Sequence, residues 1–261
     1  MKHLVKKYMR HINMNYDLRE AIINSPVDER ELTEMADRKF EGKVAICEFD
    51  NGIKLQAFKY VQGEEVYFIP EPDPIVIYFD AAIHFHKSIE KFRGVLFSEK
   101  KYSKYNAIAL SGDFNAYFAV VCSYTLFLFL ALEAFVNRMI PTGFEYKKTI
   151  QDKRTEIYNK DQIQRNIQFL EKIKYVLPEI TGRNFAREFG DKYETIMKLK
   201  NFRDEVVHTK SFEGVGSPNF YENLFISSLD FDHNKALLDA RDFINYFQAG
   251  LIEECNCGKD E

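Results

Sequence analysis

The chain has 261 residues, of which 46% are hydrophobic, and its formal net charge is −4. This length fits one large domain, or a domain with a smaller appendage, and the apolar content is sufficient for a substantial core. The charge excludes a protein that binds nucleic acid through a uniformly basic surface. The charge is uneven, however, because residues 146–210 hold 15 Lys and Arg against 10 Asp and Glu, a local +5 that leaves −9 elsewhere. A solvated helical face would explain this basic excess equally well.

The amino-terminal part predicts a small α+β region. Residues 1–40 are polar and weakly helical, with a helix expected at residues 28–35, and the first residues lack the apolar core of a secretion signal. Residues 44–49 and 53–58 flank Asn51-Gly52, a pair that supplies the positive φ angles of a tight hairpin turn. Residues 65–69 predict a third strand.

Prolines at positions 70, 72 and 74 end the strand signals and mark a domain boundary. Asp73-Pro74 is typical of a helix start, and apolar periodicity predicts helices from there to the end of the chain. The expected helices cover residues 74–97, 114–140, 161–175, 188–208 and 232–251. The predicted fold class is therefore mainly α. A small α+β head (1–73) with an antiparallel hairpin or meander precedes a helical bundle (74–254) and a short tail (255–261).

One segment raises the question of a membrane span. Residues 115–132 form an uncharged apolar run of 18 residues, the lower limit for a spanning helix, and Glu133 closes it without a basic cluster before it. A buried helix of a bundle fits this pattern better. The sequence therefore predicts a cytoplasmic protein with no membrane partner.

The sequence offers no convincing metal or cofactor site. Cys255 and Cys257 form a single pair in a polar tail, and no second cysteine pair exists to complete a tetrahedral centre. His84 and His86 lie two residues apart on a predicted helix, so they point to different sides of it. No glycine-rich phosphate loop supports a nucleotide-binding regulatory domain. We expect neither a metal nor a cofactor.

The most informative stretch lies at the end of the helix expected at residues 188–208. On a wheel of about 100° per residue, Arg203 falls inside the apolar stripe, about 40° from Leu199. His208 falls about 140° from Arg203, with Asp204 one turn before it. Arginine neutralises phosphate, histidine moves protons near neutral pH, and an aspartate at i−4 would orient the imidazole.

A companion feature lies on the apolar helix expected at residues 114–140. Glu133 and Asn137 are one turn apart on a helix that is otherwise apolar on nearly every side. Buried polar groups need partners, so we expect Glu133 to contact Arg203. Breaking a buried ion pair of this kind costs about 3–5 kcal/mol.

These two helices together resemble the HEPN superfamily, a group of helical-bundle domains. Its hallmark is an Arg, four to six residues and then a His near the end of a late helix, which Arg203 to His208 matches. Asp204 stands where Asn is more typical, and Glu133 corresponds to an acidic residue on an earlier helix. The resemblance covers roughly residues 80 to 250 and leaves the head unassigned.

The resemblance implies a metal-independent endoribonuclease that cleaves RNA by transesterification through the 2′-hydroxyl. It would act as a bacterial toxin or in defence against phage. By this resemblance, His208 transfers protons and Arg203 stabilises charge. Asp204 would orient His208, and Glu133 would position Arg203. Asn137 and Lys210 are candidate substrate-binding residues. The implied partners are RNA and a second copy of the chain, and a toxin role would add an antitoxin or regulatory protein. A homodimer would bring two motifs, and thus two histidines, together.

The same residues admit a structural interpretation. Arg203 and Glu133 would form a salt bridge that fixes helix packing, and His208 would be a helix-end histidine stabilised by the helix dipole. The chain would then be a non-catalytic dimerisation or interaction module. An open basic groove around His208 favours the enzyme, and a sealed ion pair favours the module.

Overall fold

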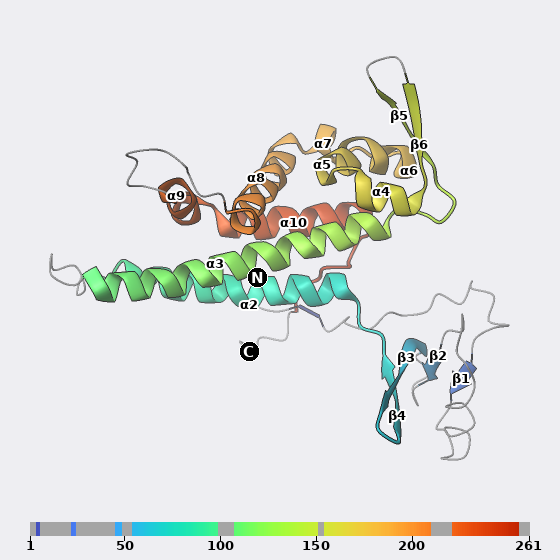
Figure 1. Ribbon diagram of the computed structural model, residues 1–261, viewed down its shortest axis with the longest axis horizontal. Helices are drawn as coiled ribbons and strands as arrows, with labels where there is room; N and C mark the ends of the chain where they lie inside the picture. The colour runs from blue at the N-terminus through green and yellow to red at the C-terminus, as the bar shows by residue number, and fades with distance from the viewer. Residues whose placement is uncertain are drawn as a thin grey trace. The chain divides into compact units, whose positions relative to one another are not determined.

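The computed structural model describes residues 4–5, 22–24, 45–48, 54–98, 107–150, 154–209 and 221–255. Helices account for most of these residues, which confirms the predicted mainly α class (Figure 1). The elements are β1 (Ile22–Asn24), β2 (Ala45–Glu48), β3 (Lys54–Gln62), β4 (Glu65–Pro70), α2 (Pro74–Leu96), α3 (Ala107–Arg138), β5 (Tyr146–Ile150), β6 (Arg154–Tyr158), α4 (Lys160–Asn166), α5 (Phe169–Glu171), the π-helix η3 (Lys172–Val176), α6 (Leu177–Thr181), α7 (Phe185–Glu188), α8 (Gly190–Val207), α9 (Glu222–Asp230) and α10 (His233–Phe247).

The chain divides into two compact units, residues 6–74 and residues 75–261 together with residues 1–5. Leu4, expected in the head, instead belongs with the helical unit, where it is buried and pairs with Glu254 in a β-bridge. The Val5 N–H donates to the carbonyl of Glu253 at 2.9 Å. The segments around Leu4 and Glu254 are therefore joined within the helical unit.

The smaller unit contains a four-stranded sheet in the order β1-β2-β3-β4. β2, β3 and β4 form the predicted antiparallel meander, with Cys47 opposite Leu55 and Lys59 opposite Phe68. β1 pairs in parallel with β2 and was not predicted. Gly63, with φ of 64°, supplies the left-handed residue of the β3–β4 turn. The Asn51-Gly52 turn and the helix expected at residues 28–35 lie outside the described residues.

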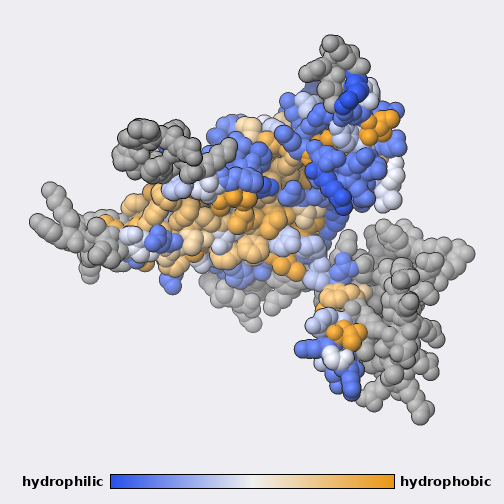
Figure 2. All heavy atoms as spheres, viewed as in Figure 1, coloured by the Kyte–Doolittle hydropathy of each residue, from blue (hydrophilic) through white to orange (hydrophobic). Residues whose placement is uncertain are grey.

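The long helix α3 is the central helix of the larger unit. It contacts α8, α9 and α10, and ring contacts of Phe127 with Tyr78 and Phe85 join it to α2. Figure 2 shows the hydrophobic residues that gather along it. Its segment Leu110–Arg138 is long and apolar enough to cross a membrane, but half of the most apolar window is buried inside the unit. Such burial is the pattern of a core helix, so this segment alone is weak support for a membrane span.

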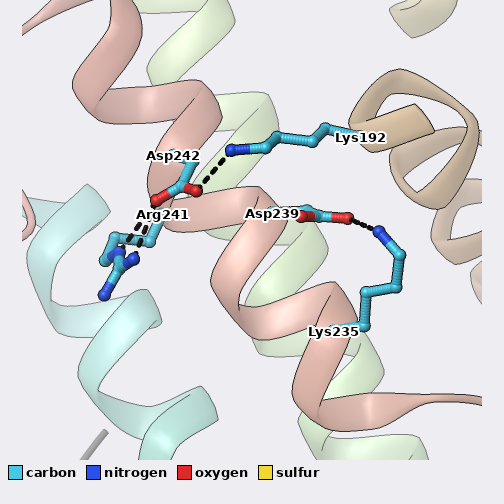
Figure 3. Close-up of polar contacts among 5 residues, drawn as sticks. All are labelled: Lys192, Lys235, Asp239, Arg241 and Asp242. Carbon is cyan, nitrogen blue, oxygen red and sulfur yellow. Dashed lines mark hydrogen bonds and ion pairs between the residues drawn. The ribbon is translucent and has the colours of Figure 1, made fainter. Parts of the chain in front are cut away.

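Helix α10 packs against α8 and α3, and its Phe243 makes aromatic contacts with α3 and α7. Phe243 meets the rings of Phe135 and Phe185 edge to face, with centroids 5.9 and 5.0 Å away. Lys192 of α8 forms a 2.7 Å ion pair with Asp242 of α10 (Figure 3). This pair is partly exposed and contributes at most about 1 kcal/mol, less than the burial of an aromatic ring such as that of Phe243.

The prediction of helices from Pro74 to the end of the chain is wrong in one place, because β5 and β6 form an antiparallel hairpin. Tyr146 opposes Tyr158, and Tyr146 packs into a core cluster with Ile140, Ile163 and Val176. Alternate residues thus face the helices, as in any half-buried strand. The β-branched and aromatic residues of this segment favour strands. Its lysines and the lack of an Asn-Gly turn do not, so the hairpin was not predicted.

The single helix predicted for residues 161–175 is also wrong. A capping box between Asn159 and Gln162 starts α4, which ends at Asn166, and Ile167 and Gln168 are extended before α5 and η3 begin. Ile167 and Phe169 are both buried, although residues two apart lie on different sides of a continuous helix. The break lets both side chains reach the core.

The other predicted helices are confirmed within a few residues at most ends. α2 begins at Pro74 as expected, α8 covers most of the segment predicted from residue 188, and α10 ends at Phe247, somewhat before the predicted end. α3 begins at Ala107, seven residues earlier than expected from the apolar run. α9 was not predicted.

Two buried histidines contact the ring of Tyr124, which is fully buried in α3. His86 of α2 and His233 of α10 have ring centroids 5.8 and 5.5 Å from that of Tyr124. Neither Nε2 atom has a hydrogen-bond partner among the described residues. Burial, with smaller contributions from His86 and Arg93, lowers the pKa of His233 to about 4.

We therefore expect the protein to lose stability in mild acid. The unfolded chain binds a proton at His233 below about pH 6.5, whereas the folded protein does not until about pH 4. Stability should be constant above pH 6.5 and fall by about 3 kcal/mol between these values. Urea unfolding of His233→Gln should show a smaller loss between pH 7 and pH 5 than the unaltered protein. The exposed His84→Gln is the matched control, and equal slopes for both variants would contradict this account.

Candidate functional site

Arg203 lies near the end of α8 and contacts three side chains. Its guanidinium carbon lies 3.9 Å from the ring centroid of Phe129, which is buried in α3. Its Nη2 atom lies 3.7 Å from Oε2 of Glu133, and Nη1 donates to Oδ1 of Asp204 at 3.0 Å. The predicted contact between Arg203 and Glu133 is therefore confirmed. Phe129 provides a flat surface that orients the guanidinium plane.

The ion pair of Arg203 and Glu133 is not sealed from solvent. The Arg203 side chain is 22% exposed and that of Glu133 is 36% exposed. Solvent screens a pair of this kind, so its contribution is about 1 kcal/mol or less. The 3–5 kcal/mol expected for a buried pair is too large for this geometry.

Asp204 is held by two cations. Its Oδ1 atom accepts from Arg203 and its Oδ2 atom lies 2.7 Å from Nζ of Lys200. Among the described residues, no hydrogen bond or ion pair joins its carboxylate to the ring of His208, so the predicted Asp204–His208 pair is not formed. Both carboxylate oxygens are already engaged by residues on the same helix. Asp204 therefore positions Arg203 rather than the histidine.

His208 is exposed at the C-cap of α8. Its backbone leaves the helix with φ of −110° and ψ of 49°, although its N–H still donates to the Asp204 carbonyl at 2.8 Å. It is five positions after Arg203 in the sequence, a rise of about 7.5 Å along the helix axis. The structure therefore brings Arg203, Asp204 and Glu133 together and leaves His208 apart, open to solvent. Lys210 lies outside the described residues.

Asn137 belongs to a second polar cluster, centred on Lys172. The Lys172 side chain comes from η3, the residue is only 2% exposed, and its Nζ donates to Oδ1 of Asn137 at 2.9 Å and to the Gln164 carbonyl at 2.8 Å. The Gln164 side chain donates in turn to the Asn137 carbonyl at 3.1 Å. Because the Asn137 side chain accepts from this buried ammonium, the structure supports a packing role for Asn137.

Lys172 was not predicted as a site residue. Burial lowers its pKa, and the nearby charge of Glu133 acts in the opposite direction. The sequence spacing could have indicated its burial, because Phe169, Lys172 and Val176 recur at i, i+3 and i+7, the period of a buried helical face. A π-helix at this point is also notable, since such irregularities frequently occur at functional sites.

The two clusters are linked through Glu133. Arg203, Lys200 and Lys172 supply three positive charges and Glu133 and Asp204 two negative ones. A phosphate at this site would meet a guanidinium that is oriented, but whose positive charge is partly neutralised by Glu133 and Asp204. In the described part of the chain, no group of three or more His, Cys, Asp or Glu could hold a metal ion.

Comparisons with known protein-family models, with curated proteins and with solved structures found no match to this chain.

We predict that Asn137→Ala destabilises the protein by about 1–3 kcal/mol, because it removes one of the two acceptors of a buried ammonium. Urea unfolding measures this change. Gln164→Ala is the matched control, since it removes a neutral hydrogen bond but leaves both acceptors of Lys172 in place. The double variant Asn137→Ala/Lys172→Met should recover part of the loss. Equal destabilisation by Asn137→Ala and Gln164→Ala would contradict the role assigned to Lys172.

Proposed function

We propose that this protein is a metal-independent endoribonuclease of the HEPN type. The observation that supports this best is an arginine oriented by Phe129, Glu133 and Asp204 at the same helix end that presents an exposed histidine. A held guanidinium and an accessible imidazole are the two groups that cleavage of an RNA backbone needs when no metal takes part.

The reaction is an intramolecular transesterification. One neutral histidine takes the proton of a ribose 2′-hydroxyl, and the oxygen attacks the adjacent phosphorus. A protonated histidine donates to the 5′-oxygen as the phosphorus–oxygen bond to it breaks. The products are a 2′,3′-cyclic phosphate and a 5′-hydroxyl. Arg203 stabilises the negative charge that develops on the phosphoryl oxygens, and Asp204 and Glu133 hold Arg203 in place.

A homodimer completes this scheme, because each chain supplies one such histidine while the reaction uses a base and an acid. His208 lies on a different side of α8 from Arg203, so two copies of the helix end that meet about a two-fold axis combine both groups. We place the enzyme in the cytoplasm, as a toxin or phage-defence nuclease that acts on RNA and is restrained by an antitoxin or another regulator.

A second candidate is a non-catalytic interaction module, and one observation favours it. The Arg203 guanidinium already contacts two carboxylates and an aromatic ring, so it has a structural role without any substrate. The exposed position of His208 favours the enzyme, because a purely structural motif has no need for an accessible imidazole.

We expect His208→Ala to abolish cleavage of mixed RNA without changing the thermal midpoint, because His208 is exposed. Arg203→Ala should also abolish cleavage and should cost about 1–2 kcal/mol of stability through the lost ion pair and ring contact. Cleavage should persist in EDTA and leave cyclic phosphate ends, as analysed by mass spectrometry. The exposed His84→Ala serves as the control. Activity that requires Mg²⁺, or that survives in His208→Ala, would exclude this mechanism.

Light scattering at micromolar concentration should give the mass of a dimer. Dimers that combine one unaltered chain with one His208→Ala chain should lose nearly all activity, because the proposed site uses both histidines. A monomer that cleaves RNA, or a mixed dimer with half of the normal rate, would refute the shared site.

A further inference from the structure

A groove of about 460 Å³ lies beside the β5–β6 hairpin, away from the Arg203 cluster. Three parts of the chain line it: strand β5, the segment formed by α5 and η3, and the first turn of α8. Its lining residues are Tyr146, Lys147, Lys148, Thr149, Leu170, Glu171, Lys174, Tyr175 and Tyr193. Figure 2 shows that hydrophilic residues gather on this end of the helical unit.

The groove carries uncompensated positive charge. Its one acidic residue, Glu171, accepts from Lys148 at 2.7 Å and from the Tyr146 hydroxyl at 3.4 Å. Lys147 and Lys174 are exposed and form no ion pair with a described residue. Two lysine ammonium groups therefore remain available to an anion.

Aromatic rings lie among these lysines. Tyr175 is 51% exposed, and the Lys174 ammonium lies 5.3 Å from its ring centroid. Tyr193 is half-buried at the opposite wall. Lysines that neutralise phosphates, interleaved with open rings on which bases stack, are the combination by which proteins hold single-stranded nucleic acid. A site for an acidic peptide would have no need for the rings.

One face of α8 connects this groove to the catalytic candidates. On a wheel of about 100° per residue, Tyr193, Lys200, Asp204 and His208 fall within about 80° of one another. None of these four residues is buried, whereas the opposite stripe of the helix is. Tyr193 and Arg203 are separated by about 15 Å along the axis. A strand in the groove can thus follow the open face of α8 towards the helix end.

We infer that this groove binds the single-stranded RNA substrate on one side of the cleaved bond, with Lys147 and Lys174 on phosphates and Tyr175 stacked on a base. The inference rests on the proposed ribonuclease function. The groove would give the proposed ribonuclease a substrate-binding site that is separate from Arg203 and His208.

Binding can be measured separately from cleavage. The probe is a fluorescein-labelled 2′-O-methyl RNA of mixed sequence, about 12 nucleotides long, within the usual site sizes. Its methylated 2′-oxygen cannot attack, so fluorescence anisotropy reports binding alone. Lys147→Gln/Lys174→Gln is compared with Lys91→Gln/Lys198→Gln, a control pair of exposed lysines elsewhere in the helical unit with the same change in charge. Tyr175→Ala is compared with Tyr175→Phe, which keeps the ring.

The groove double variant should bind more weakly than the control pair, and the slope of log affinity against log salt should flatten by about 1.4 for two lost phosphate contacts. Tyr175→Ala should weaken binding about 5- to 150-fold, and Tyr175→Phe should not. With cleavable RNA, the same variants should raise KM more than they lower kcat.

Equal affinities for the groove and control variants, or no binding of the probe by the unaltered protein, would overturn the inference. Cleavage that proceeds normally in the groove variants would overturn it and leave the ribonuclease proposal intact. Groove-dependent binding of RNA that is never cleaved would instead refute the ribonuclease proposal and retain the groove as an RNA site.

Discussion

The buried ammonium of Lys172 is the constraint on which the site region depends. An unpaired charge in the interior is costly, so this side chain is tolerated only where acceptors surround it. The amide of Asn137 on α3 and the Gln164 carbonyl near the end of α4 provide them. These two bonds fix the end of α3, the end of α4 and the π-helix in one arrangement. Because α4 ends at Asn166, the Gln164 carbonyl near its end has no partner within the helix and can accept a hydrogen bond from Lys172.

The Arg203 site is built on the same column of α3. Phe129, Glu133 and Asn137 follow one another at intervals of four residues, so they lie on one side of the helix. Phe129 contacts the Arg203 guanidinium, Glu133 pairs with Arg203 and its charge also acts on Lys172, and Asn137 binds Lys172. The carboxylate that pairs with the arginine therefore lies one turn from the amide that binds a different, buried cation.

Some of this arrangement could be predicted from the sequence and some could not. The meander and most helices follow from turn residues and apolar periodicity, and the contact of Arg203 with Glu133 follows from the need of buried polar groups for partners. The β5–β6 hairpin was not predicted because its exposed face is rich in lysine. Its tyrosines, Tyr146 and Tyr158, pack on a cluster that includes Val176 and Ile180 from beyond the break after α4. Lys172 was not predicted as a buried residue, because a lysine is normally exposed and its two hydrogen-bond acceptors cannot be identified from the sequence. Asp204 was assigned to His208 by spacing alone, which could not anticipate competition from Arg203 and Lys200.

Helix α8 shows how one element serves both packing and chemistry. Its buried stripe of Ile196, Leu199 and Phe202 attaches it to the core, and Arg203 at the edge of that stripe reaches the column on α3. Its open face extends from Tyr193 at the groove to His208 at the C-cap. Because the helix is held along its whole buried side, the distance between the groove and the histidine is set by a rigid backbone. A substrate that occupies both ends would therefore be oriented by the geometry of α8 itself, and remote contacts in the groove would contribute to placing the reacting phosphate.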